Sequence, residues 1–593
     1  MITELFPPRI GAKVSGAVFP GKPQFIQKTE LGDAFRIAAR LDSCLVEGGK
    51  NGLLYARDLL DELMSRHGGI PCAEYSDSPD LNFRCYHIDL KKGSGGVEDI
   101  KRTLKRLHQL RYNAVLIEYE NRIRLDSLPG VEADDAFTHD EVREIVRCAG
   151  ENGLKVIPLL QSLGHLEYLL RLPAYRKYSE SQTDFSQFCP LNEAAFELWK
   201  KAFDEMHSLH PHSEYFHIGG DETRQLGICP ACAEYVKDHS REELFFNHIS
   251  RVCQYAVDQG VRPILWHDML ARAGRFDLLG KLPKETILLY WEYISKEDSI
   301  SRILFKERTL VSRDWIGRVR SFRDFTEAPK AFVRFIEDEP QELPETFRKP
   351  AILPLLEPMK KTGLTVWGAS SLGYSPCGTL LSDTDRVHSN MRMWRDSGIE
   401  GIIVTRWASN DSLDAARGPA SLRDLPLMMA AELMWNGTLE RNELSDRYSR
   451  SFGTGTEQLA GLLDIMVYSE SEQFFNWAEH AAPEFAALEK GIDPQLMWLF
   501  RKYTAAMDAE LLIRQIRSLI RNQSGQLAQS AFAQKLHQRI PQIKQKLREN
   551  FADEYPEPSL EEWLKRLFEP YDAMFAGLGM LRDKKEDLDS GSC

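Results

Sequence analysis

The 593-residue sequence lacks the features of several protein classes. It has no uninterrupted apolar run of about 18 residues, so no membrane span is predicted. Its N-terminus, Met-Ile-Thr-Glu-Leu-Phe, lacks the basic segment and apolar core of a secretory signal. Its 10 cysteines are sparse and irregularly spaced, which favours reduced thiols over a disulfide framework. We therefore expect a soluble, cytoplasmic protein.

A surplus of positive charge is also missing. The chain has 75 Lys and Arg against 88 Asp and Glu, a formal net charge of −13. Binding to the phosphates of nucleic acid or of anionic membranes needs the opposite balance, so neither partner is expected. Hydrophobic residues make up 43% of the chain, which excludes a wholly disordered protein.

What the sequence does have is an alternation of short apolar runs and amphipathic stretches. Thr138 and Glu141 have the spacing of a capping box and open one of the predicted helices. Apolar runs this short are typical of strands buried on both faces. Eight of them, alternating with helices, predict a (β/α)8 TIM barrel of the α/β class. The predicted strands are 83–89, 113–119, 154–160, 214–219, 262–268, 286–291, 363–368 and 401–407.

Three domains are expected on this basis. Residues 1–80 form a small α/β domain with a helix at 53–64, and residues 81–440 form the barrel, with an insertion near 300–362. Residues 441–593 read as a helical domain, including a long helix at 496–520, with a short charged tail. The wide apolar faces of these helices fit either an intramolecular bundle or a homodimer, and the sequence leaves both open.

The fourth predicted strand ends in the most distinctive stretch of the chain, His217-Ile-Gly-Gly-Asp-Glu. Active sites of barrels lie at the carboxyl ends of the strands. Adjacent residues of a strand point to opposite faces, so Asp221 and Glu222 face one site only if the backbone turns. Gly219 and Gly220 permit that turn. An acidic loop exposed to solvent is the alternative interpretation.

Four tryptophans mark the ends of the next four predicted strands: Trp266, Trp291, Trp367 and Trp407. A single tryptophan is usually a core residue. Four of them around a carboxylate pair suggest an aromatic box that packs against the C–H groups of a sugar ring. This combination points to a glycosidase.

These residues carry a resemblance to glycoside hydrolase family 20, the β-N-acetylhexosaminidases, and most closely to its hexosaminidase D-like members. The resemblance spans about residues 45–440. Upstream of the barrel, residues 48–63 resemble the end of the small α/β domain that often precedes it. The segments that carry the resemblance within the barrel are YHIDLKKG (86–93), LIEYE (116–120), VIPLLQSLGHLEY (156–168), HIGGDE (217–222), LWHDML (265–270) and GIIVTRW (401–407).

The resemblance implies removal of terminal non-reducing β-GlcNAc or β-GalNAc from glycans or glycoconjugates, with no cofactor. The family's substrate supplies its own nucleophile, the 2-acetamido carbonyl, and an oxazolinium intermediate forms with retention of configuration. Glu222 would be the general acid and base, and Asp221 would orient the acetamido group. A sugar-binding protein that has lost catalysis is the competing hypothesis, against which the intact pair argues.

Further substrate contacts are carried over position by position. Arg84 would bind the O3 and O4 hydroxyls, and Asp411 would bind O4 or O6. His165 would lie near the catalytic pair, and Tyr374 would reach the acetamido oxygen. The walls of the pocket would be Trp266, Trp291 and Trp407.

Two positions depart from the family pattern. Gln161 replaces the acidic residue that most members carry four positions before the histidine, although hexosaminidase D-like sequences share the glutamine. Ser409 replaces the usual glutamate two positions after the last tryptophan. The choice between GlcNAc and GalNAc therefore stays open, and the resemblance to the hexosaminidase D-like group slightly favours tolerance of GalNAc.

A pair of cysteines follows the acidic motif closely, Cys229-Pro-Ala-Cys232. This spacing provides half of a zinc site, and a second pair is missing. Reduced thiols in a loop are the expected state. A zinc site needs two further ligands, for which the candidates are Cys189, Cys253, His217 and His239.

Overall fold

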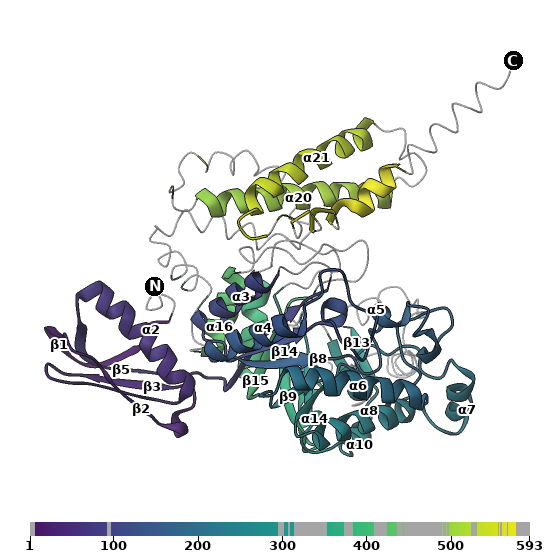
Figure 1. The fold of residues 1–593 in the computed structure, drawn as a ribbon, viewed down its shortest axis with the longest axis horizontal. Coiled ribbons are helices and arrows are strands. Elements are labelled where there is room, and N and C mark those ends of the chain that lie inside the picture. Colours follow the sequence, from purple (N-terminus) through teal and green to yellow (C-terminus); the bar gives the residue numbers. More distant parts are fainter. Residues whose placement is uncertain are drawn as a thin grey trace, which may run out of the picture.

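The computed structural model describes most of the chain up to residue 576 (Figure 1). The continuous described ranges are 6–91, 96–293, 302–305, 309–312, 353–372, 384–407, 424–435, 497–522 and 531–555, with scattered single or short stretches besides. The predicted site residues Tyr374 and Asp411 lie outside the described residues, as do Ser409 and the charged tail.

The chain begins with a five-stranded sheet, ordered β1-β5-β3-β4-β2. Helix α2 (Lys50–His67) packs on one face of this sheet, covers the predicted helix 53–64 and extends beyond it (Figure 1). The strands are β1 (Arg9–Phe19), β2 (Gln24–Gln27), β3 (Phe35–Ala39), β4 (Cys44–Gly48) and β5 (Ile70–Asp77).

The eight predicted barrel strands are present and close into a parallel barrel in the order β10-β11-β14-β15-β6-β7-β8-β9. The predicted TIM-barrel fold is therefore confirmed. The strands are β6 (Phe83–Asp89), β7 (Ala114–Glu118), β8 (Lys155–Leu159), β9 (Tyr215–His217), β10 (Arg262–Trp266), β11 (Ile287–Trp291), β14 (Thr365–Ser371) and β15 (Gly401–Thr405).

Helices surround the barrel (Figure 1). The capping box predicted at Thr138 and Glu141 is formed at the start of α4, and a second one, Ser240 with Glu243, starts α8. The barrel helices are α3 (Val97–Gln109), α4 (His139–Glu151), α5 (Glu167–Leu170), α6 (Glu193–Leu209), α7 (Pro230–Asp238), α8 (Arg241–Asp258), α9 (Asp268–Ala271), α10 (Phe276–Leu279), α14 (Leu356–Lys360), α15 (Thr384–Asp396) and α16 (Asp424–Trp435).

The barrel interior is a packed apolar core, as parallel strands buried on both faces require. Trp367 belongs to this core, where its ring stacks on Phe83 at a centroid distance of 4.1 Å. The prediction that Trp367 ends the seventh strand is wrong. Strand β14 continues to Ser371, and Gly368 lies inside it at a close-packed position, where a Cβ would lie 2.6 Å from the ring of Trp394.

Within the predicted insertion, β12 (Arg302–Phe305) and β13 (Thr309–Ser312) form an antiparallel pair. Toward the C-terminus, α20 (Met497–Asn522) and α21 (Ala531–Phe551) pack along each other (Figure 1). The first begins one residue after the start of the helix predicted at 496–520 and extends two residues beyond its end. Among the described helices, none combines the length and the apolar character that crossing a membrane requires.

Candidate active site

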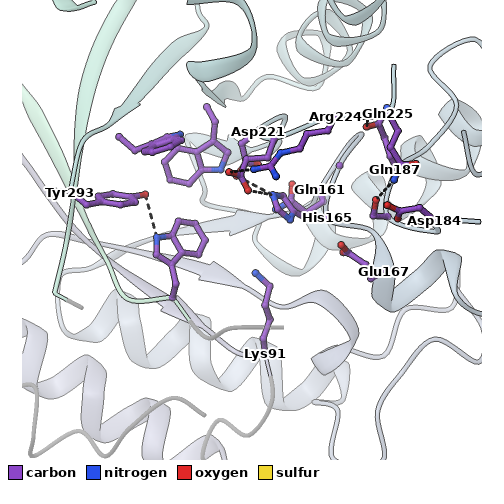
Figure 2. A pocket seen from close by; sticks show the side chains of 16 residues that line it. Lys91, Gln161, His165, Glu167, Asp184, Gln187, Asp221, Arg224, Gln225 and Tyr293 are labelled. Carbon is purple, nitrogen blue, oxygen red and sulfur yellow. Dashed lines mark hydrogen bonds and ion pairs between the residues drawn. The ribbon is translucent and has the colours of Figure 1, made fainter. Parts of the chain in front are cut away.

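A cavity of about 530 Å³ lies at the carboxyl ends of the barrel strands (Figure 2). Six residues predicted from the sequence line it, including both acidic residues and three of the four tryptophans. The lining is Lys91, Gln161, Gly164, His165, Glu167, Asp184, Ser186, Gln187, Asp221, Glu222, Arg224, Gln225, Trp266, Trp291, Tyr293 and Trp407.

The backbone after β9 makes the turn that the two glycines predicted. Gly219 and Gly220 have φ angles of +68° and +86°, and Glu222 itself has φ +46°. A Cβ at Gly219 would lie 1.8 Å from Oε1 of Gln161, so a larger residue does not fit. Left-handed backbone costs a non-glycine residue about 1 kcal/mol or more, and its presence at Glu222 is typical of functional sites. This turn directs Asp221 and Glu222 into the same cavity.

Asp221 is the inner member of the pair. Its Oδ2 lies 3.3 Å from Nε2 of His165, and its Oδ1 is buried without a hydrogen-bond partner among the described residues. The Asp221 charge raises the pKa of His165 to about 9, although burial opposes the shift. Figure 2 shows the two side chains turned toward each other. The buried Oδ1 is therefore an acceptor available to a ligand donor.

Glu222 is the outer member, and 40% of its side chain is exposed. Its backbone N–H donates to Oδ2 of Asp268 at 3.1 Å, which fixes the backbone of the turn. Its Oε1 accepts from Nη2 of Arg224 at 3.0 Å. Burial, aided by the charge of Asp221, raises the pKa of Asp268 to about 6. Glu222 is thus positioned by its main chain and open to the cavity through its carboxyl group.

Aromatic rings form one side of the cavity. Trp266 and Trp407 lie 5.7 Å apart between ring centroids, and Trp291 stacks on Tyr293 at 5.5 Å. The indole N–H of Trp407 donates to the hydroxyl of Tyr293 at 3.3 Å (Figure 2). The three tryptophans predicted as walls therefore meet, and the sequence analysis missed Tyr293, two residues beyond Trp291.

A buried cation also lines the cavity and was not predicted. Nζ of Lys91 lies 2.9 Å from Glu118, 3.5 Å from Glu120 and 3.7 Å from Asp89. Burial alone lowers the pKa of Lys91, but these carboxylates raise it well above its usual value. Burial also raises the pKa of Glu120, to about 8. Nε2 of Gln161 donates to Glu118 at 3.1 Å, which connects this cluster to the turn at Gly219.

Arg84 is not in the cavity. It is the second residue of β6 and lies at the amino end of the barrel, only 1% exposed. Its guanidinium donates to Asp33 of the N-terminal sheet domain at 2.5 Å and to the carbonyl oxygens of Leu81 and Arg111, both at 2.8 Å. The prediction that Arg84 binds substrate is corrected accordingly: Arg84 joins the N-terminal sheet to the barrel.

Comparison with known families matches residues 82–313 to the catalytic domain of glycosyl hydrolase family 20. These barrel residues carry a glycoside hydrolase family 20 catalytic domain. The chain is therefore a glycoside hydrolase, and the resemblance predicted from its six segments is confirmed.

Curated relatives agree with this assignment to family 20. The chain is 28% identical to hexosaminidase D of Bos taurus over 250 residues, which cover 41% of this chain and 72% of that protein. It is also 28% identical to hexosaminidase D of Homo sapiens over 239 residues, which cover 39% of this chain but only 49% of the human protein.

Solved structures confirm the fold. A β-N-acetylhexosaminidase from Bacteroides fragilis superposes with a TM-score of 0.52 and 18% identity, covering 72% of this chain and 82% of that one. A Flavobacterium johnsoniae chitobiase superposes with a TM-score of 0.51 and 15% identity, covering 90% and 86%. The likeness in fold thus extends beyond the barrel residues that the family model matches.

Proposed function

We propose that this protein is an exo-acting β-N-acetylhexosaminidase. It would remove terminal non-reducing β-GlcNAc or β-GalNAc by a retaining, substrate-assisted mechanism. The observation that carries the proposal is the placement of two adjacent carboxylates, Asp221 and Glu222, in one aromatic-walled cavity with different surroundings. Catalysis by the substrate's acetamido group needs one carboxylate as an anionic acceptor and the other as a proton carrier.

Asp221 suits the acceptor role. Its buried Oδ1 has no hydrogen-bond partner among the described residues, which is costly unless a ligand supplies a donor. The acetamido N–H is such a donor. Accepting it orients the acetamido carbonyl toward the anomeric carbon and offsets the positive charge that develops there. The positively charged His165 on Oδ2 keeps the Asp221 side chain in place.

Glu222 suits the proton-carrier role because its carboxyl group is accessible from the cavity. In the first step the acetamido oxygen forms a bond to C1 while the glycosidic C1–O bond breaks. Glu222 donates its proton to the leaving oxygen, and an oxazolinium ion remains. In the second step water attacks C1, Glu222 takes the water's proton, and the C1–O bond of the oxazolinium opens. Two inversions leave the product in the β configuration.

The cavity supports terminal cleavage. Its volume of about 530 Å³ lies in the lower half of the range for small-molecule sites, about 300–1,000 Å³. Trp291 and Trp407, which are partly exposed, supply ring faces for one sugar, and buried Trp266 packs beside Trp407. The polar side formed by His165 and Gln161 supplies hydrogen-bonding groups. Such a pocket accommodates the end of a glycan better than a continuous chain.

The test is hydrolysis of aryl β-GlcNAc and aryl β-GalNAc by wild type, Glu222→Gln and Asp221→Asn. We expect activity in the wild type and losses of about 10²–10⁴-fold in Glu222→Gln and about 10²–10³-fold in Asp221→Asn. Asp140→Asn, which alters an exposed carboxylate outside the cavity lining, is the matched control and should stay active.

Two further measurements separate the two roles. Loss of the acid in Glu222→Gln should slow aryl glycosides with poor leaving groups far more than those with good ones, because only the former need protonation. Replacing the acetamido group by trifluoroacetamido should slow the wild type, since the carbonyl becomes a weaker nucleophile. A folded protein that binds N-acetylhexosamines yet hydrolyses neither substrate would refute the proposal in favour of a sugar-binding protein.

A further inference from the structure

Three cysteines and a glutamate come together beside the active-site loops. They are Glu180, Cys189, Cys229 and Cys232, and their donor atoms all lie within 4.8 Å of one another. All except Cys229 are buried. Glu180 and Cys189 bracket one loop, and Cys229 and Cys232 start helix α7. No step of the proposed hydrolysis uses this cluster.

The separations of the sulfur atoms suit a shared ion. Sγ of Cys189 lies 3.5 Å from Sγ of Cys229 and 3.6 Å from Sγ of Cys232. A disulfide requires about 2.05 Å. Tetrahedral ligation with Zn–S bonds of about 2.3 Å separates two sulfurs by about 3.8 Å. The observed distances of 3.5 and 3.6 Å are close to the separation in a zinc site and far from that in a disulfide.

The turn at Cys229 arranges two of the sulfurs for ligation. Cys229 is the N-cap of α7, Pro230 occupies the first turn, and the N–H of Cys232 donates to Sγ of Cys229 at 3.4 Å. A Cys-x-x-Cys turn of this kind puts both sulfurs on one side. The N–H donor offsets part of the negative charge that a thiolate would carry.

The environment of Glu180 also favours a bound cation. It is 1% exposed. Its Oε1 accepts from the backbone N–H groups of Ile228 at 2.7 Å and Cys229 at 3.0 Å. Its Oε2 is buried and has no hydrogen-bond partner within the described parts of the chain. A buried carboxylate oxygen without a partner is unfavourable unless a cation or a hydrogen-bond donor meets it.

We propose that Glu180, Cys189, Cys229 and Cys232 bind one structural Zn²⁺ ion. Three thiolates and one carboxylate match the preference of zinc for sulfur-rich, tetrahedral sites, and harder cations such as Mg²⁺ and Ca²⁺ prefer oxygen ligands. Because the protein supplies all four ligands, no position remains for a reacting water, so the site is structural.

The other ligands considered from the sequence are not part of this cluster. Cys253 is buried within helix α8, and the ring of His239 stacks on Tyr235. His217 lies in strand β9 with its ring beside Trp266. Of the four candidates, Cys189 is the one whose sulfur lies beside those of Cys229 and Cys232. The sequence did not indicate Glu180, which lies nine residues before it.

The ion would hold together two loops that line the cavity. Gln187 lies just before Cys189, and Gln225 lies between the acidic pair and Cys229. The N–H of Gln225 donates to Oε1 of Gln187 at 3.1 Å, so the loops already contact each other. The zinc site would therefore anchor the far end of the loop that carries Glu222. This consequence for activity rests on the proposed function, whereas metal binding does not.

The first test is metal analysis of the full-length protein, expressed with Zn²⁺ in the medium and purified with a reductant. We expect one zinc ion per chain, measured by inductively coupled plasma mass spectrometry. Cys189→Ser and Cys232→Ser should each lose most of it. Cys253→Ala is the matched control, because it removes a buried thiol outside the cluster, and it should retain the metal.

A second measurement covers the case in which the cysteine variants fail to fold. Wild-type protein stripped with a chelator should take up Co²⁺ and develop the thiolate-to-cobalt charge-transfer absorption of a tetrahedral sulfur site. Glu180→Gln should keep the fold but weaken Zn²⁺ binding measurably.

Three outcomes would overturn the proposal. The first is a wild-type protein that contains no zinc and takes up neither Zn²⁺ nor Co²⁺, and the second is a disulfide from Cys189 to Cys229 or Cys232 in non-reducing mass spectrometry. The third is a zinc loss in Cys253→Ala as large as that in the cluster variants. Hydrolysis is assayed in parallel. An active, metal-free protein refutes only the zinc site, and an inactive, zinc-loaded protein refutes only the proposed function.

Discussion

The double-glycine turn provides a direct test of how the acidic pair is positioned. We choose Gly219→Ala. The added Cβ would lie 1.8 Å from Oε1 of Gln161, and ordinary contact begins near 3.4 Å. Either the Gln161 amide or the turn itself must therefore move by about 1.6 Å. A shift of Gln161 also disturbs its hydrogen bond to Glu118. The substitution therefore rearranges the site whether Gln161 or the turn moves.

The expected effect has two parts. The φ angle of +68° at Gly219 costs an alanine about 1–2 kcal/mol in stability. A displacement of about 1 Å at a reacting group costs about 100-fold in rate. We therefore expect a modest drop in the midpoint of thermal unfolding together with a loss of at least about 100-fold in kcat/KM.

Gly398→Ala separates the two parts. Gly398 has the same φ angle, +68°, but nothing lies within 4 Å of its added Cβ, and it precedes β15 away from the cavity. It should show the stability loss and keep its activity on aryl β-N-acetylhexosaminides. If folded Gly219→Ala hydrolyses these substrates as fast as Gly398→Ala, the turn does not position Asp221 and Glu222 and the reasoning is refuted.

Three further predictions concern charged side chains. The raised pKa of His165 predicts an alkaline fall in kcat/KM near pH 9, absent in His165→Gln. Because the pKa of His165 in the folded protein exceeds the ordinary histidine value of 6.5, the stabilisation by this pair is complete below about pH 6.5. It is lost as pH rises through about 9, which thermal melts would follow. Arg84→Met should lower the free energy of unfolding by about 3 kcal/mol in denaturant titrations with KM unchanged, since half-buried Asp33 loses its cation and the carbonyl oxygens of Leu81 and Arg111 lose a donor; a raised KM in a fully stable variant would contradict this. Lys91→Met leaves three carboxylates without their cation and should lower the free energy of unfolding by about 3–5 kcal/mol in the same titrations. An unchanged free energy of unfolding would show that the carboxylates take up protons instead.

Much of the architecture followed from the sequence because buried parallel strands leave a strong pattern. The runs that became β7 and β11 are apolar at nearly every position, and the Asp221–Glu222 pair follows the fourth run. Since the carboxyl ends of all barrel strands meet at one end, strand order alone brought Trp266, Trp291 and Trp407 to the pair.

The error at Arg84 has a geometric cause that the sequence already contained. Asp89 lies five positions after Arg84, and a strand rises about 3.3 Å per residue, so the two lie about 16 Å apart along β6. With Asp89 at the carboxyl end, Arg84 must lie at the amino end. The sequence did not indicate that Asp33 pairs with Arg84, because Asp33 lies in another domain.

Other site residues were missed because their roles depend on packing between distant segments. Lys91 and Glu118 both lie at strand ends within segments that carried the family resemblance, yet a charged residue after a strand is usually exposed. Only the closed barrel brings the two together. Glu180 is a stronger case, since its neighbours in the cluster come from two other parts of the chain.

The segment from Gly219 to Cys229 carries both acidic residues without forming a helix or a strand, and a site needs them fixed to a fraction of an ångström. The structure holds it at three points. Gly219 packs against Gln161 at its start, and the N–H of Glu222 donates to Asp268 in its middle. Glu180 accepts the N–H of Cys229 at its end. Asp268 and Glu180 are both buried carboxylates with one oxygen that has no hydrogen-bond partner among the described residues. Glu180 also has the sulfur atoms of three cysteines within 4.8 Å, so the end of the segment is the point at which a bound cation would contribute most to the rigidity of the loop.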